Sequence, residues 1–293
     1  MNTINDFITL ARQELLPLYD AGELNQILFL LVEDVMGFSK TDFQLKKNEP
    51  LSGSDSEKLG HFIEQLKLNK PVQYVLGSTW FSGMKFIVNE NVLIPRPETE
   101  ELCSWLLSHI SQLQSHISLL DIGTGSGCIA ITLKKNLPSA SVHAMDISPG
   151  ALEVAKQNAE LNKTEIIFYQ GDILSKDFET SGNEKFDVIV SNPPYIRRSE
   201  MNSMSVHVKD HEPHTALFVK DDDALLFYRA IVDFSKNHLK ENGRLFFEIN
   251  ASMGQEIQDL LLEKGFRDIE LKKDLSGNSR MVQALAALNH LIT

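Results

Sequence analysis

The sequence has 293 residues, 42% of them hydrophobic and 23% charged, a composition that excludes an intrinsically disordered chain. Its 28 basic and 40 acidic residues give a formal net charge of −12, which argues against direct binding of nucleic acid, where Lys and Arg neutralise phosphates. Two cysteines, no signal-peptide pattern and no apolar run long enough for a membrane span lead us to expect a cytoplasmic protein without membrane contact.

Residues 1–70 carry helical patterns. Apolar residues recur at helical spacing in three stretches: Ile4, Phe7, Ile8, Ala11, Leu15 and Leu18; Leu24, Ile27, Leu28, Leu31 and Val35; and Leu59, Phe62, Ile63 and Leu66. Gly37 stands where the second helix would end, and residues 54–57 form a capping-box pattern before the third. We therefore predict a small helical-bundle domain over residues 1–70.

A linker follows. Pro71 interrupts the helical period, and residues 72–75, 80–81, 85–88 and 92–94 are short β-prone pieces, with a Ser82-Gly83 turn signal. This pattern predicts a β-hairpin linker over residues 71–97.

Residues 98–293 alternate between short apolar runs and helical stretches. The runs are 117–122, 141–145, 166–169, 186–190 and 244–249, and the helical stretches are 128–135, 150–161, 224–238 and 253–264. Such alternation predicts an α/β domain with a parallel sheet. A last run, 281–286, follows Gly277 closely enough to pair antiparallel with its predecessor.

A glycine-rich turn follows the first strand of this domain, in the pattern Asp121-x-Gly123-x-Gly125-x-Gly127. Glycines let the backbone approach a ligand closely at the carboxyl edge of the sheet. Asp146 follows at the end of the next strand, where a carboxylate can accept both ribose hydroxyls of an adenosine. The alternatives are a tight packing turn and a dinucleotide site, although Cys128 stands where a dinucleotide motif needs glycine.

Two further acids bear on the ligand. Asp121, directly before the glycines, disfavours a pyrophosphate and suits a cationic amino-acid tail. Asp172, after the third strand, is placed to meet an adenine amino group, although an ordinary loop acid would look the same.

Asn192-Pro193-Pro194-Tyr195 ends the fourth strand. Proline fixes its own φ and has no N–H, so this loop cannot continue a strand ladder and holds a rigid shape. The Asn192 side-chain oxygen and the Pro193 carbonyl are suited to accept the two N–H groups of a planar amide or amine, and Tyr195 offers a face for stacking. The alternative is that this segment forms an ordinary turn without a function.

His207, His211 and His214 cluster beyond this loop, but Pro213 interrupts any helix that would align them. We therefore expect no metal site and interpret the segment as a flexible loop facing the substrate. For Arg96, contact with a ligand and a structural salt bridge are equally good interpretations.

The chain resembles the class I methyltransferases, and within them the peptide chain release factor glutamine methyltransferases (the HemK/PrmC family). The resemblance rests on residues 92–100 (Val-Leu-Ile-Pro-Arg-Pro-Glu-Thr-Glu) joined to Asn192–Tyr195 and covers nearly the whole chain. Shorter matching segments are residues 73–77, 212–213, 247–249 and 274–277 with Arg280.

This resemblance implies a seven-stranded Rossmann-like domain over residues 98–293, a helical domain that docks the substrate protein, and S-adenosylmethionine as cofactor. The substrate would be the glutamine of the Gly-Gly-Gln loop of bacterial class I release factors, methylated on N5 and held by Asn192, Pro193, Pro194 and Tyr195. The residues implied to hold the cofactor are Gly123, Thr124, Gly125, Ser126, Gly127, Asp146, Asp172, Ile173 and Asn192. Rival interpretations are an N6-adenine or other nucleic-acid amino methyltransferase, a non-catalytic binding protein and a nicotinamide oxidoreductase.

Overall fold

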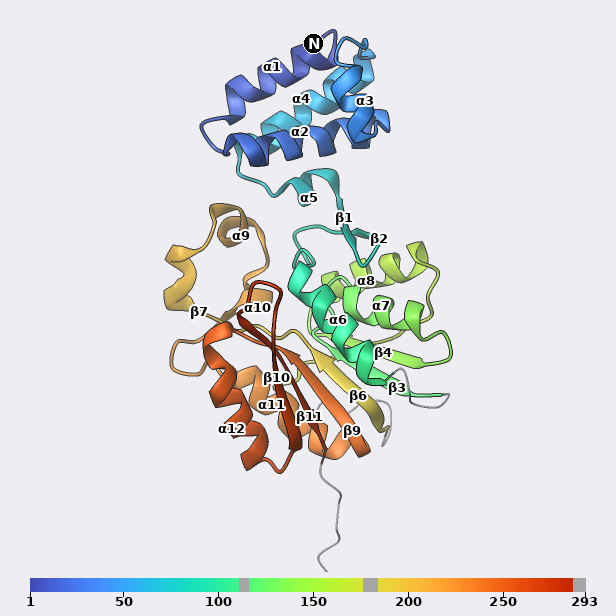
Figure 1. The fold of residues 1–293 in the computed structure, drawn as a ribbon, viewed down its shortest axis with the longest axis vertical. Coiled ribbons are helices and arrows are strands. Elements are labelled where there is room, and N and C mark those ends of the chain that lie inside the picture. The colour runs from blue at the N-terminus through green and yellow to red at the C-terminus, as the bar shows by residue number, and fades with distance from the viewer. Residues whose placement is uncertain (111–115, 176–183, 287–293) are drawn as a thin grey trace, which may run out of the picture. The chain divides into compact units, whose positions relative to one another are not determined.

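The computed structural model describes residues 1–110, 116–175 and 184–286, and these divide into two compact units (Figure 1). Unit 1 comprises Met1–Ser78 together with Ser205–His211, and unit 2 comprises Thr79–Met204 and Glu212–Thr293. Within the described ranges, no helix has the length and apolar character needed to cross a membrane.

Unit 1 is a helical bundle. Its helices are α1 (Ile4–Leu15), α2 (Ala21–Met36), α3 (Lys40–Leu45), α4 (Gly53–Lys67), α5 (Val72–Leu76) and α9 (Val206–His211). The apolar stripes of α1, α2 and α4 meet in one core, as their spacing predicts. Leu18 is the exception, because α1 ends at Leu15 and leaves Leu18 42% exposed.

Caps explain where these helices begin and end. Gly37 ends α2 with φ 68°, the left-handed conformation that glycine adopts without strain. The N-cap of α4 is Ser52, whose hydroxyl accepts the Asp55 N–H, so the predicted start at Ser54 was wrong by two residues. Residues 72–75, predicted as β-prone, form α5 instead, because Pro71 precedes the first turn and Gly77 closes the last one.

Helix α9 packs within unit 1 although it lies far along the chain. The His207 ring stacks on Tyr19, with ring centroids 5.1 Å apart, and its Nδ1 donates to the Asn69 carbonyl at 2.7 Å. His211 Nε2 donates to the Leu68 carbonyl at 3.0 Å. This segment was predicted to be a flexible loop, yet two histidines bind it to the carbonyls that follow α4.

Unit 2 begins with the predicted hairpin, β1 (Ser78–Phe81) and β2 (Met84–Ile87), which turns at Ser82 and Gly83. Residues 92–94 form no strand, since they run as irregular chain into α6 (Pro97–Ile110). The sequence patterns did not reveal α6, whose first residue is a proline.

The central sheet has seven strands in the order β10-β11-β9-β6-β3-β4-β5. Their bounds are β3 (Ser118–Ile122), β4 (Ser141–Asp146), β5 (Ile167–Gln170), β6 (Phe186–Ser191), β9 (Leu239–Glu248), β10 (Arg267–Lys273) and β11 (Ser279–Leu285). Strands β5, β4, β3, β6 and β9 are parallel, whereas β11 pairs antiparallel with β9 and β10. The predicted α/β class and the antiparallel last strand are thereby confirmed.

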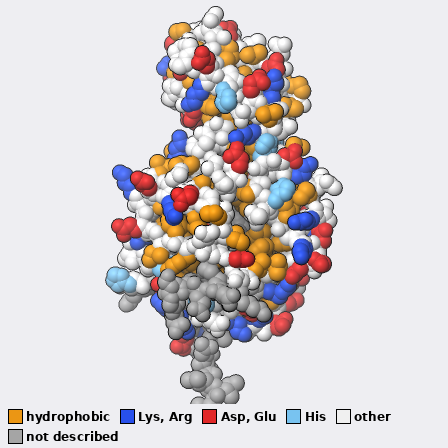
Figure 2. All heavy atoms as spheres, turned by 180° about the vertical axis from the view of Figure 1, so that it is seen from behind, with side chains coloured by type: hydrophobic (Ala, Val, Ile, Leu, Met, Phe, Trp, Pro, Cys, Tyr) orange, Lys and Arg blue, Asp and Glu red, His pale blue; other side chains and the backbone are white. Residues whose placement is uncertain are grey.

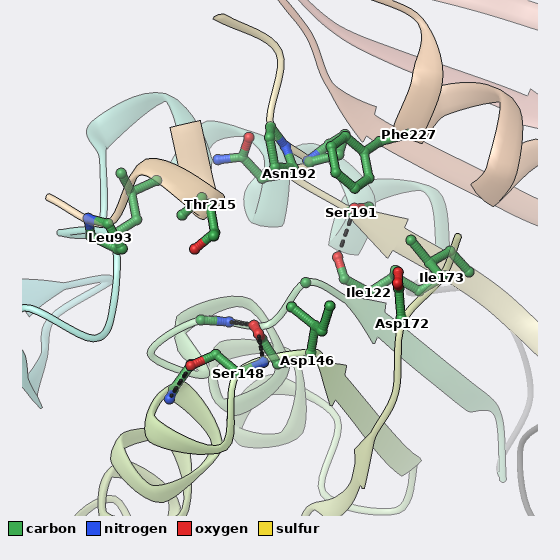
Figure 3. A pocket seen from close by; sticks show the side chains of 18 of the residues that line it. Leu93, Ile122, Asp146, Ser148, Asp172, Ile173, Ser191, Asn192, Thr215 and Phe227 are labelled. Carbon is green, nitrogen blue, oxygen red and sulfur yellow. Dashed lines mark hydrogen bonds between the residues drawn. The ribbon is translucent and has the colours of Figure 1, made fainter. Parts of the chain in front are cut away.

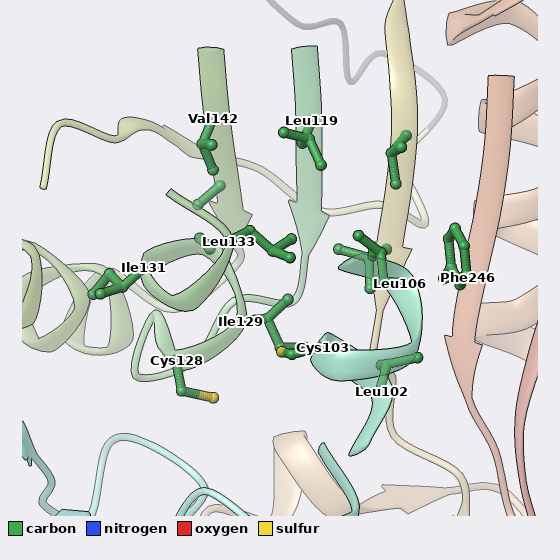
Figure 4. Packing of buried hydrophobic residues seen from close by; sticks show 14 of the residues in the cluster. Leu102, Cys103, Leu106, Leu119, Cys128, Ile129, Ile131, Leu133, Val142 and Phe246 are labelled. Atoms are coloured by element: carbon green, nitrogen blue, oxygen red, sulfur yellow. The ribbon is translucent and has the colours of Figure 1, made fainter. Parts of the chain in front are cut away.

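Helices cover both faces of the sheet. Strand residues alternate between the two cores: Leu119, Val188 and Val190 join α6 and α7, whereas Leu120 and Ile189 join α11 and α12. Figure 4 shows the first core, where Leu102, Leu106 and Ile129 pack against β3 and β6. The helices of this unit are α7 (Cys128–Asn136), α8 (Pro149–Leu161), α10 (His214–Leu217), α11 (Leu226–His238) and α12 (Gly254–Glu263), with α6 given above.

Candidate active site

The site lies where the order of the strands reverses. The chain builds β3, β4 and β5 outward in one direction and then returns to place β6 on the other side of β3. Ile122 and Ser191, the last residues of β3 and β6, are register partners, and the Ser191 hydroxyl donates to the Ile122 carbonyl at 2.6 Å. In open α/β sheets, ligands bind in the crevice outside the carboxyl ends of strands at such a switch point.

The glycine-rich turn crosses the end of β3. Gly123 and Gly125 have φ of 75° and 54°, and a Cβ at either would stand in open space at the wall of the cavity. Gly127 faces the interior instead, since a Cβ there would approach Ile131 and Ala155 to 3.1 and 3.2 Å. The first two glycines thus leave room for a ligand, while the third lets α7 and α8 pack closely.

Asp121 organises this turn from within. Its Oδ2 accepts the Thr124 hydroxyl at 2.7 Å and the Ala130 N–H at 3.3 Å. Its Oδ1 is buried and has no hydrogen-bond partner among the described residues. Burial raises the pKa of Asp121 to about 7. The carboxyl group therefore supports the turn and does not line the cavity. From the sequence, it was expected to suit the cationic amino-acid tail of a ligand.

Asp146 ends β4 and faces the cavity (Figure 3). Its Oδ2 accepts the Gly125 N–H at 2.8 Å and its Oδ1 accepts the Ser148 N–H at 2.9 Å. Desolvation raises the pKa of Asp146, which these two hydrogen bonds oppose. Each carboxylate oxygen keeps a second lone pair, so both ribose hydroxyls of an adenosine have an acceptor here.

The cavity has a volume of 470 Å³, within the usual range for small-molecule sites. Among the residues predicted to hold a cofactor, those that line it are Gly123, Gly125, Asp146, Asp172, Ile173 and Asn192. Thr124 and Ser126 are buried in the turn, so a contact with cofactor stays a prediction for them and for Gly127. Residues without an assigned role also line it: Leu93, Arg198, Met201, His214, Thr215 and Phe227.

Asn192, Pro193 and Pro194 line the cavity at the end of β6, and Figure 3 shows Asn192 across the cavity from Asp146. Asn192 Nδ2 donates to Thr99 Oγ1 at 3.3 Å. Within the described part of the chain, no donor bonds Asn192 Oδ1. The acceptor atom that the proposed chemistry needs is therefore available.

Tyr195 points its hydroxyl at a buried acid. Its Oη donates to Glu248 Oε1 at 3.3 Å, and Thr99 Oγ1 donates to Glu248 Oε2 at 2.6 Å. Burial raises the pKa values of both Tyr195 and Glu248. Stacking of the Tyr195 ring on a substrate stays a prediction, because the ring packs partly against the hydrophobic core.

Thr99, Glu248 and Glu212 carry contacts at the site that the sequence patterns did not assign. Glu212 is buried, pairs with Arg96 at 2.5 Å and accepts the Ile94 N–H at 3.3 Å. Of the two interpretations of Arg96, the structure therefore supports the structural salt bridge. For Glu248 a signal existed: an acid that ends the apolar run Leu245-Phe246-Phe247 has to be buried and therefore needs partners.

The three histidines divide between the two units. His207 and His211 belong to unit 1, whereas His214 lines the cavity of unit 2. Over residues 1–110, 116–175 and 184–286, no group of three His, Cys, Asp or Glu side chains has the geometry to hold a metal ion.

A seven-stranded sheet in which β11, next to one edge, runs antiparallel to the other strands, with a ligand cavity at the switch point, defines the Rossmann-like methyltransferase class. Residues 99–209 match the family described as the methyltransferase small domain, and residues 11–77 match the PrmC N-terminal domain. A methyltransferase structure from Pyrococcus furiosus is 16% identical, with a TM-score of 0.52 over 81% of this chain and 100% of that one, which supports the fold alone.

Two curated relatives, both named release factor glutamine methyltransferase, align over nearly the full length. The protein from Flavobacterium psychrophilum is 43% identical over 96% of this chain and 98% of its own, and that from Bacteroides thetaiotaomicron is 39% identical over 97% and 99%. The chain therefore belongs to the release factor glutamine methyltransferase family. Enzymes of this family take their methyl group from S-adenosylmethionine and release S-adenosylhomocysteine.

The cavity fits this cofactor. Asp146 offers acceptors for the ribose, Gly123 and Gly125 leave space beside the turn, and Asp172 has one carboxylate oxygen bonded to the Leu174 N–H and the other available. The apolar side chains of Ile122, Ile147 and Ile173 line the cavity around the carboxylates. Such a mixture of apolar walls and a few placed polar groups is typical of nucleoside sites.

Proposed function

We propose that this protein methylates N5 of the glutamine side chain in the Gly-Gly-Gln loop of a class I peptide chain release factor. One observation carries the proposal: Asn192 lines the cavity with its nitrogen bonded to Thr99 and its side-chain oxygen bonded by no described donor, in a chain related over nearly its full length to release factor glutamine methyltransferases. Since translation factors work in the cytoplasm, we also propose that location for the enzyme.

The chemical problem is that an amide nitrogen is a poor nucleophile, because its lone pair is delocalised into the carbonyl group. In the proposed complex, Asn192 Oδ1 and the Pro193 carbonyl each accept one N–H of the glutamine amide. These two bonds hold the amide plane, aim the nitrogen at the methyl group and stabilise positive charge as it develops on nitrogen.

When bound, S-adenosylmethionine would supply a methyl group activated by the positive charge on its sulfur. The amide nitrogen held by Asn192 and Pro193 would take this methyl group and the positive charge as the S–C bond breaks, and would then release one of its two protons. No strong base is needed, because the proton leaves after transfer. Pro193 and Pro194 keep the loop rigid, so that the acceptor atoms need not reorganise during the reaction.

Asn192→Ala should lower kcat by about a hundredfold or more while leaving the Kd for S-adenosylhomocysteine within about twofold, because the variant loses an orienting acceptor and keeps the ribose carboxylate. Turnover would be followed by mass spectrometry of a release factor after incubation with S-adenosylmethionine. The matched control is Asn237→Ala, an exposed asparagine on α11. Equal losses of turnover and cofactor affinity would contradict the orienting role.

The main rival acceptor is an exocyclic amine of a nucleic-acid base, because its NH₂ group needs the same two acceptors. On the face drawn in Figure 2, Lys and Arg side chains are interspersed with Asp and Glu, an arrangement that favours a protein substrate over a polyanion. Parallel incubations with a release factor, a release factor whose glutamine is replaced by alanine, tRNA and DNA decide between them. Methyl on nucleic acid, with none on the release factor, would overturn the proposed substrate.

A further inference from the structure

The side chain of an asparagine can serve as acceptor or donor, depending on which way its amide group is turned. Turned one way, Asn192 offers the cavity an oxygen that accepts an N–H; turned by 180°, it offers an NH₂ group that repels one. The reaction proposed above works in only one of these orientations. Some contact outside the cavity must therefore distinguish the nitrogen of Asn192 from its oxygen.

Thr99 makes that contact. It lies in the first turn of α6, 93 residues from Asn192 in the sequence, and its Oγ1 is 3.3 Å from Asn192 Nδ2. A threonine hydroxyl alone does not discriminate, because it can donate to an oxygen as well as accept from a nitrogen. What matters is where its single proton points.

Glu248 fixes that proton. Thr99 Oγ1 lies 2.6 Å from Glu248 Oε2, a short distance typical of a hydroxyl bonded to a carboxylate. A carboxylate accepts and never donates, so the threonine proton is committed to Glu248. Only the lone pairs of the hydroxyl then face Asn192, and they accept the Nδ2–H group but no oxygen.

The surroundings keep Glu248 in this role. Thr99 and Glu248 are 3% and 2% exposed, so water does not compete for either group. Glu248 Oε1 accepts the Tyr195 hydroxyl, and the charge of Arg280, itself bonded to Asp274, favours the ionised carboxylate against the desolvation that raises the pKa of Glu248. The directed chain therefore runs from Asn192 through Thr99 to Glu248, all within unit 2.

We propose that Thr99 and Glu248 are positioning residues that fix the amide of Asn192 with its oxygen toward the substrate. They touch neither substrate nor cofactor in this scheme, and they act through Asn192. The inference rests on the proposed function, in that it assumes an acceptor with N–H groups to be bound. It extends that function by naming two residues, outside the Asn-Pro-Pro-Tyr loop, on which the orientation of the loop depends.

The decisive variant is Thr99→Val, which keeps the shape of the side chain and removes the hydroxyl. We expect kcat to fall by about tenfold or more, because the amide of Asn192 loses its directing partner, while KM for the cofactor stays within about twofold. Thr99→Ser restores the hydroxyl and should recover most of kcat. The matched control is Thr132→Val, since Thr132 is also buried and its Oγ1 has no hydrogen-bond partner in the described ranges.

Two measurements separate this role from a merely structural one. In the Asn192→Ala background, Thr99→Val should cost no further activity, because the residue through which it acts is already gone. In protein labelled with ¹⁵N-asparagine, the side-chain NH₂ signal that disappears in Asn192→Ala should exchange with solvent faster in Thr99→Val than in wild type. Wild-type kcat in Thr99→Val, an equal loss in both backgrounds, or unchanged exchange would each overturn the proposal.

The substrate proposal fails or stands independently of these variants. If the wild-type enzyme leaves the release factor unmodified and methylates a base amine, the substrate is wrong, and the same variants are then compared with that acceptor. If the wild type methylates the glutamine and Thr99→Val does so equally fast, the positioning role is wrong and the substrate stands.

Discussion

Asp121 lies beneath the glycine-rich turn as a carboxyl group whose pKa of about 7 departs far from its ordinary value of 3.8. The cause is burial: the Thr124 hydroxyl and the Ala130 N–H satisfy one oxygen, and the other has no partner among the described residues. Such a group binds a proton more tightly in the folded protein than in the unfolded chain, so ionising it costs part of the free energy of folding.

This shift predicts a pH dependence with a definite sign. Between pH 4 and pH 7 the unfolded chain has released the proton of Asp121 and the folded protein keeps it, so the contribution to stability falls as pH rises and is lost above about pH 7. At about 1.4 kcal/mol per pKa unit, the change is on the order of 4 kcal/mol.

Asp121→Asn removes the titrating group at nearly constant shape. The free energy of unfolding, measured in urea between pH 4.5 and pH 8, should therefore fall more steeply with pH in wild type than in the variant. The comparison uses the difference between the two curves, because other carboxylates titrate in both proteins. Parallel curves would show that Asp121 is ionised throughout the range.

At the scale of single elements, α9 is the segment whose behaviour the structure makes testable. Its ends are joined in sequence to unit 2, yet His207 and His211 donate to the Asn69 and Leu68 carbonyls of unit 1. Tyr19, on which His207 stacks, donates its own hydroxyl to the Leu66 carbonyl at 3.1 Å. These contacts keep residues 205–211 folded on unit 1.

His207→Ala should loosen this segment. Loss of one hydrogen bond, worth about 1 kcal/mol, raises the open fraction roughly fivefold, and loss of the stacking contact adds to this. Cleavage by trypsin after Lys209, followed by mass spectrometry under native conditions, should accelerate by at least that factor. His61→Ala, an exposed histidine on α4, is the control. Unchanged cleavage in His207→Ala would mean that other contacts hold α9.

The periodicity of apolar residues and the positions of proline and glycine predicted most of the helices and strands. The apolar stripes of α1, α2 and α4 and five of the parallel-sheet runs were predicted, because burial repeats with the period of the element. Strand β10 was not assigned, since Arg267–Lys273 alternates charged and apolar residues at the edge of the sheet and carries no apolar run. The prediction of a β-prone piece at residues 72–75 was wrong, because the flanking Pro71 and Gly77 favour a short helix there despite the β-prone side chains.

The residues of the site likewise comprise some that local sequence predicts and some that it does not. Gly123 and Asn192 stand directly after strands and Asp146 ends one, so local sequence predicts them as site residues as soon as the strands are found. Thr99 and Glu248 meet across 149 residues, through side chains whose direction depends on how α6 packs on β9. No local pattern encodes such a contact, although a carboxylate within an apolar strand indicates that some partner has to exist.

At the scale of the whole molecule, the two units have separate cores. One core joins α1, α2 and α4, and two others cover the faces of the sheet. The residues that line the cavity at the switch point all belong to unit 2. A ligand that binds only folded unit 2 stabilises it by mass action, by about 2.7 kcal/mol at a concentration of one hundred times its Kd.

In a hydrogen-exchange experiment, S-adenosylhomocysteine should therefore protect amides of unit 2 and leave those of unit 1 unchanged. At one hundred times its Kd, amides of β3, β4 and β6 that exchange through unfolding of unit 2 should slow by about a hundredfold, whereas those of α1, α2 and α4 should keep their rates. Asp146→Ala supplies the control, because the same protection should then require a higher ligand concentration if its carboxylate binds the ribose. Equal slowing in α1 and β3 would mean that the two units unfold together. Unchanged exchange in both would contradict binding of the cofactor in this cavity.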